Sequence, residues 1–178
     1  MIGRPLAAAL RALRVIGTAA LSGFVAGAVA GLASRVAMRI VGLMAGPDAL
    51  WSPAHAVIGE GRSSGGQVVG EVTFGGTLEV VLGSAINGVI GGLLYVAFRP
   101  WLARLGPWHG IAFGLLLLLT FGALLFGVGP DSATFRRYGV PAVNVALFAA
   151  LFPVFGLIVA LVADGLQRAL PSRRPAHL

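Results

Sequence analysis

Apolar and polar residues occupy long separate blocks along this chain. Four blocks carry no charged residue and are separated by polar segments rich in glycine and proline; they cover residues 15–34, 80–98, 111–128 and 143–163. A helix needs about 20 predominantly apolar residues to cross a membrane. The pattern therefore predicts an all-α, single-domain membrane protein whose four transmembrane helices form a bundle. The approximate spans are 15–43, 77–98, 109–128 and 142–164.

The composition agrees with this class and excludes others. Hydrophobic residues make up 57% of the 178 residues and charged residues only 11%, whereas soluble domains carry roughly 25% charged residues. A disordered chain would need low hydrophobicity. The chain contains no cysteine, which excludes disulfide bonds and thiolate chemistry. An integral membrane protein is the class that remains.

The distribution of charge predicts an orientation. All 13 basic residues are arginines, which suggests a bacterium with a GC-rich genome. With the N-terminus inside, the inner segments hold eight arginines and one acid, and the outer segments hold five arginines and five acids. Basic residues accumulate on the cytoplasmic side of membrane proteins. We therefore expect a multi-pass protein of the bacterial cytoplasmic membrane with both termini in the cytoplasm.

A cleaved signal peptide is the alternative interpretation of the N-terminus. Three arginines precede the first apolar block, and small residues lie near its end. The apolar core of a signal peptide has about 7–15 residues, and the block 15–34 is longer. We therefore interpret it as a transmembrane helix.

The long connection 47–76 is expected to lie outside the cell and to contain a small β-hairpin. Residues 67–74 are β-prone and partly alternating, and residues 54–59 could pair with them across a glycine- and serine-rich turn. Thr77 is the expected N-cap of the second helix. Glu79 would then lie near the positive end of that helix.

Small residues recur at four-residue spacing on the first two predicted helices. They are Gly23, Gly27 and Gly31 on the first, and Ser84, Gly88 and Gly92 on the second. Small residues allow membrane helices to approach closely, so these two helices are the expected close pair. The alternative is chance, because glycine is frequent in membrane helices.

The polar candidates for a ligand site lie near the outer ends of these two helices. Arg35 and Arg39 continue the small-residue spacing, and Glu79 and Glu71 are the candidate acidic partners. In one interpretation the arginines end the first span and contact lipid phosphates. In the other they face the bundle and form a buried site with Glu79, because a charge inside a bilayer is costly unless it is paired.

Two further polar groups have expected roles. Asn87 lies near the middle of the second helix, where we expect an interhelical hydrogen bond; the alternative is that it lines a substrate path. Asp164 is expected to pair with Arg168 four residues later on the fourth helix.

The sequence shows no pattern typical of catalysis, metal binding or cofactor binding. His55 is expected on the opposite side of the membrane from His109 and His177, so the three histidines cannot share a metal. Zinc-protease and phosphate-loop motifs are missing from the sequence. We therefore expect no catalytic residues, metal or cofactor.

The function expected from these patterns is non-enzymatic. We expect a small membrane protein that binds a partner or joins a larger assembly. The alternative is a small oligomeric transporter or channel with Arg35, Arg39, Glu79 and Asn87 along its path; a lipid-modifying enzyme has the least support. The expected partners are the lipid bilayer and either another membrane protein or further copies of the chain, and not nucleic acid.

Overall fold

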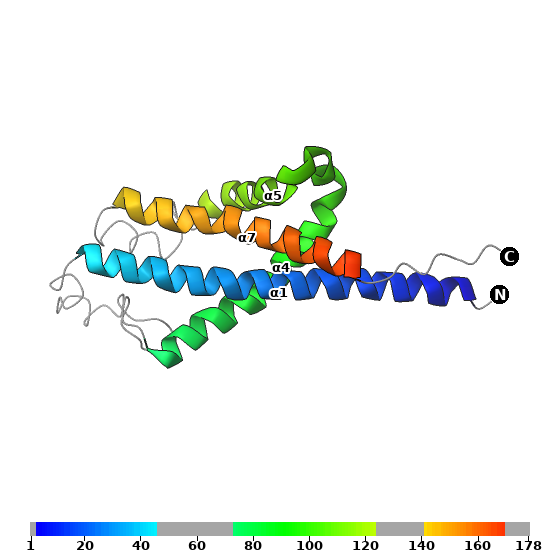
Figure 1. Cartoon of the computed structure of the whole chain (residues 1–178), viewed down its shortest axis with the longest axis horizontal. Coiled ribbons are helices and arrows are strands. Elements are labelled where there is room, and N and C mark those ends of the chain that lie inside the picture. Colours follow the sequence, from blue (N-terminus) through cyan, green and yellow to red (C-terminus); the bar gives the residue numbers. More distant parts are fainter. Residues whose placement is uncertain (1–2, 46–72, 124–140, 170–178) are drawn as a thin grey trace.

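A computed structural model of the chain describes residues 3–45, 73–123 and 141–169, and all the regular structure in these ranges is helical. The three long helices are α1 (Gly3–Ala45), α4 (Phe74–Leu102) and α7 (Pro141–Ala169). Between α4 and α7 lie the 3₁₀ helix η1 (Ala103–Trp108), the helix α5 (His109–Leu117) and the π-helical turn η2 (Leu118–Gly122) (Figure 1).

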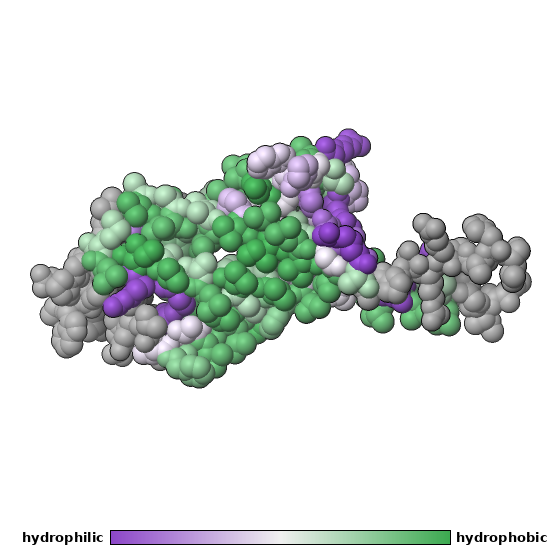
Figure 2. All heavy atoms as spheres, in the orientation of Figure 1, coloured by the Kyte–Doolittle hydropathy of each residue, from purple (hydrophilic) through white to green (hydrophobic). Residues whose placement is uncertain are grey.

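Three helical stretches are long and apolar enough to cross a membrane. They are Leu6–Val41, Phe74–Gly122 and Ala142–Ala169. Hydrophobic residues cover the middle of the molecule in Figure 2, and hydrophilic residues gather towards its ends. The prediction of a helical membrane protein is thus confirmed.

The predicted count of four transmembrane helices is not supported. The second stretch includes α4, η1, α5 and η2 and contains a kink at Gly106. On the predicted third span, 109–128, the described helical residues belong to α5 and η2, which contain nine and five residues. Residues 124–128 of that span lie outside the described residues.

The predicted outer hairpin is not supported either. Most of the segment 47–76 lies outside the described residues. Its described part, 73–76, contains the N-cap and the first residues of α4. Thr73 has an extended backbone, and Phe74 is the first residue of α4. The two C-terminal residues of the predicted strand 67–74 therefore cap and begin a helix.

The N-cap of α4 is Thr73 and not Thr77, so that prediction was wrong by one turn. The Thr73 hydroxyl accepts a hydrogen bond of 3.2 Å from the backbone N–H of Gly76. Thr77 lies within the first turn, where its hydroxyl donates to the Thr73 carbonyl at 2.8 Å. The Thr73 hydroxyl thus satisfies one of the free N–H groups of the first turn.

Helix α1 begins at Gly3 rather than near Val15 and has 43 residues. At 1.5 Å per residue its length is about 64 Å, roughly twice the hydrocarbon thickness of a bilayer. Residues 6–17 are exposed, and burial begins at Thr18. Arginine is a good helix former, so Arg11 and Arg14 interrupt the apolar pattern without ending the helix.

The helices pack in the contact order α4, α1, α7 and α5. Helix α1 packs against α4 and α7, and α5 packs against α7. The turn between α4 and α5 depends on Gly106, whose φ of 57° and ψ of −130° suit glycine and strain other residues. Figure 1 shows that the start of α1, this turn and the end of α7 lie towards one end of the molecule, here called the inner end.

Candidate functional site

Helices α1 and α4 touch backbone to backbone along their small residues. Gly23 lies against Gly88 and Gly92, and Gly27 lies against the backbone of Ser84. A Cβ atom added at Gly31 would lie 2.9 Å from the Cα of Val81 and 3.0 Å from the Cβ of Ser84. The structure therefore brings the six small residues singled out in the sequence to one interface.

Helices α5 and α7 make a second contact of the same kind. Gly110 and Gly114 lie against Gly156, and Gly114 also lies against the backbone of Phe152 and Pro153. The earlier residue on α5 meets the later residues on α7, so the two helices run antiparallel. The packing of both pairs thus depends on glycines that leave no room for a methyl group.

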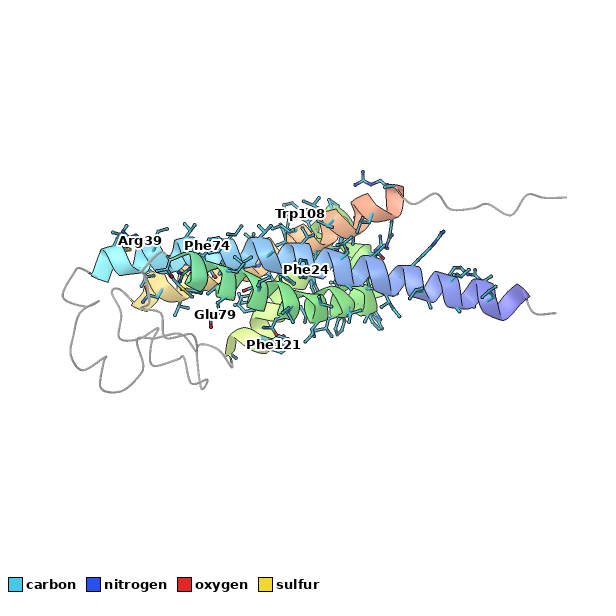
Figure 3. The ribbon with its side chains drawn as sticks, turned by 90° about the horizontal axis from the view of Figure 1, so that it is seen from below. Phe24, Arg39, Phe74, Glu79, Trp108 and Phe121 are labelled. Carbon is cyan, nitrogen blue, oxygen red and sulfur yellow. The ribbon has the colours of Figure 1, made fainter. Side chains whose placement is uncertain are left out.

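The charged candidates near the other end of α1 and α4 are only partly assembled. Arg39 is exposed, and Arg35 and Glu79 are partly buried. In Figure 3 Arg39 and Glu79 point to opposite sides of the helix pair. None of the three is without an interaction partner. The Arg35–Glu79 pair stays a prediction, and Glu71 lies outside the described residues.

Asn87 is exposed on the outside of α4. Its neighbours Ile86 and Ile90 are 64% and 60% exposed, and a Cβ atom added at Gly83, one turn earlier, would meet nothing within 4 Å. The interhelical hydrogen bond expected for Asn87 is not formed within the part of the chain that the structure describes.

A cluster of polar side chains at the inner end, which the sequence did not predict, joins α4 and α5 to α7. The Asp164 carboxylate accepts a hydrogen bond of 2.7 Å from Arg99 Nη2 and lies 3.4 Å from His109 Nε2. Arg99 Nη1 donates to Oε1 of Gln167. We call Arg99, His109, Asp164 and Gln167 the inner clamp.

The predicted ion pair between Asp164 and Arg168 was wrong. Arg168 Nε donates instead to the backbone carbonyl of Asp164 at 3.2 Å. The carboxylate turns to Arg99, which the α4–α5 turn places beside α7. Asp164 is the single acid assigned to the inner side, so a pairing with some inner arginine was foreseeable from the sequence, but the choice of Arg99 was not.

Tyr95 lies beneath the inner clamp with none of its surface exposed. Its ring packs edge-on against Phe113, with centroids 5.3 Å apart, and lies 6.1 Å from the His109 ring. Its buried hydroxyl has no hydrogen-bond partner among the described residues. His109 is itself fixed by the turn, since Nδ1 lies 2.6 Å from the Gly106 carbonyl, which can only accept.

The inner clamp has the chemistry of a structural connection. Its carboxylate accepts a hydrogen bond from the Arg99 guanidinium and lies beside the His109 ring. Within the described residues there is no group of three His, Cys, Asp or Glu side chains that could hold a metal ion. The side chains of Arg99 and Asp164 are 35% and 31% exposed, so solvent weakens the ion pair.

We expect Arg99→Gln and Asp164→Asn each to lower the free energy of unfolding by about 1 kcal/mol. The loss of unfolding free energy in the double variant should be smaller than the sum of the two single losses by about 0.5–1 kcal/mol. The reason is that either single change already breaks the Arg99–Asp164 hydrogen bond. Unfolding by SDS in mixed micelles measures this. Arg104→Gln, at an exposed position in η1, is the control and should be neutral. Additive losses would show that the two side chains do not interact.

The fold and these contacts define the class: an all-helical membrane protein with glycine-mediated helix contacts. Comparison of the chain with protein-family models, with curated proteins and with solved structures found no match.

Proposed function

We propose that this chain is a non-enzymatic subunit of a membrane assembly and that it binds another transmembrane helix through one face of α4. This face, called here the α4 outer face, consists of Leu82, Gly83, Ile86, Asn87 and Ile90. The three apolar side chains are between 46% and 64% exposed. The contacts to α1 use other residues of α4, among them Ser84 and Gly88, so the α4 outer face stays available.

The observation that carries the proposal is the exposed Asn87. It lies about 20 Å from either end of α4 at 1.5 Å per residue, which corresponds to the middle of a bilayer with a hydrocarbon core of about 30 Å. A carboxamide carries two N–H donors and an acceptor oxygen. Hydrocarbon offers no partner for them, and burying such a group without hydrogen bonds is costly. A second helix with a polar group at the same depth removes this cost.

Exposed apolar side chains alone do not distinguish a binding face from a lipid-facing one. Leu119 and Leu161 are 77% and 58% exposed on other helices, and lipid satisfies such residues fully. The α4 outer face differs from these lipid-facing surfaces because it contains Asn87 and because Gly83 leaves space for another helix to approach closely.

The topology that we propose for this subunit has four passes and both termini in the cytoplasm of a bacterium. The asymmetry of the arginines supports the orientation. The sharp turn at Gly106 and the antiparallel contact of α5 with α7 support a second crossing within the stretch Phe74–Gly122. The inner clamp would then lie at the cytoplasmic surface.

Replacement of Asn87 by leucine tests the proposal. The wild-type chain, released from lipid nanodiscs into a mass spectrometer, should have an intact mass above that of one chain. Asn87→Leu should weaken the assembly about 3- to 20-fold, the range for one interhelical hydrogen bond in a membrane. The control is Leu161→Ala, at an exposed apolar position on α7, which should leave the assembly unchanged. An unchanged assembly in Asn87→Leu would contradict the proposal.

A further inference from the structure

We infer that the partner helix is α4 of a second copy of this chain, with the two Asn87 carboxamides hydrogen-bonded to each other across a two-fold axis. The inference rests on the proposed function, because it identifies the helix that covers the α4 outer face.

Depth is the first reason for a second copy. Two copies inserted with the same orientation have a two-fold axis along the membrane normal, so Asn87 of one copy lies at the same depth as Asn87 of the other. An unrelated helix would need its own polar residue at that depth. A symmetric dimer also places the same patch on both sides of the interface.

The chemistry of the carboxamide is the second reason. The side chain is both donor and acceptor, so two copies of Asn87 can exchange N–H···O hydrogen bonds and satisfy each other. A charged group such as a carboxylate or guanidinium would repel its own copy. Asparagine is thus a polar residue that suits contact with itself, and paired asparagines fix the register of helix dimers elsewhere.

The shape of the surface is the third reason. Leu82, Ile86 and Ile90 follow one another at four-residue spacing, and Gly83 and Asn87 form a second row beside them. A Cβ atom at Gly83 would meet nothing within 4 Å, so the gap it leaves faces outward. A second α4 can approach closely at Gly83, which brings the carboxamide one turn later within hydrogen-bonding reach.

Single cysteines test this directly, because the chain has none of its own. We would place one at Ile86 or Ile90, and as a control at Leu161, which is 58% exposed on α7. Full-length chains in phospholipid vesicles are then oxidised with copper phenanthroline. Ile86→Cys or Ile90→Cys should give a dimer of two identical chains, and Leu161→Cys should not.

Gly83→Leu, added to Ile86→Cys or Ile90→Cys, should reduce the yield of cross-linked dimer at least about tenfold. The leucine side chain would fill the space through which the second α4 approaches. The same change at Gly17, where a Cβ atom also meets nothing within 4 Å, should leave the yield unchanged. Both variants keep the internal contacts of the chain, so their helical circular dichroism should match wild type.

The possible outcomes separate this inference from the proposed function. Dimers at Ile86 or Ile90 that Gly83→Leu removes would support both. A cross-link from these positions to a different protein would overturn the inference that the partner is a second copy, and it would leave the proposed partner-binding function standing. No cross-link to any chain, together with the intact mass of a single chain in lipid, would overturn both.

Discussion

Replacing Gly88 with alanine should lower the free energy of unfolding by about 2–3 kcal/mol, near the upper end of the usual range for overpacking. The added methyl carbon would lie 2.8 Å from the Cα of Gly27 and 3.1 Å from its backbone nitrogen, and it would overlap the carbonyl oxygen of Gly23. These are backbone atoms, so no side chain can rotate away. Helices α1 and α4 would have to separate, which forfeits the contacts of the whole interface.

The matched control is Gly17→Ala on α1, the other helix of this contact, where the added methyl meets nothing within 4 Å. Glycine destabilises the interior of a helix by about 0.5–1 kcal/mol relative to alanine, so this variant should be neutral or slightly more stable. Reversible unfolding by SDS in mixed micelles, followed by circular dichroism, measures both. Equal stabilities of the two variants would show that α1 and α4 do not meet at Gly88.

The second large effect is expected at the contact of α5 with α7. A methyl carbon at Gly114 would lie 2.5 Å from the Cα of Pro153 and 2.7 Å from the carbonyl carbon of Phe152. Gly114→Ala should therefore destabilise the protein by about 2–3 kcal/mol. The effect should reach the core, because Phe113 is fully buried next to this contact and packs on Tyr95.

Gly165→Ala is the control for this contact, since it lies on α7 and its added methyl would meet nothing within 4 Å. It should leave the unfolding midpoint unchanged or raise it slightly. If Gly114→Ala were as stable as Gly165→Ala, the proposed antiparallel pairing of α5 with α7 would be wrong, and with it the support for a second crossing in the stretch Phe74–Gly122.

The class of the protein and its close helix contacts were accessible from the sequence for simple physical reasons. Long uncharged blocks identify helices that can enter a membrane, because only a helix satisfies its own backbone there. The four-residue spacing of Gly23, Gly27 and Gly31 is visible because neighbouring turns bring such residues to one face. The number of crossings stays a prediction, because it depends on how the chain continues on either side of the turn at Gly106.

The polar sites were harder to predict because they depend on how helices rotate and turn. Whether Asn87 faces inward or outward depends on which face of α4 meets α1, and the neighbouring small residues made an inward position plausible. The inner clamp depends on the α4–α5 turn, which places Arg99 beside Asp164. Spacing along one helix therefore predicted Arg168 as the partner of the Asp164 carboxylate. In the structure Arg168 donates a hydrogen bond to the backbone carbonyl of Asp164 instead.

In our proposal another helix covers the α4 outer face inside the bilayer. The intact mass of the wild-type assembly, released from lipid nanodiscs without prior extraction in detergent, tests it most directly. The wild-type mass should be that of at least two chains, and it should fall towards the mass of one chain in Asn87→Leu. A wild-type mass of one chain with bound lipid would contradict it.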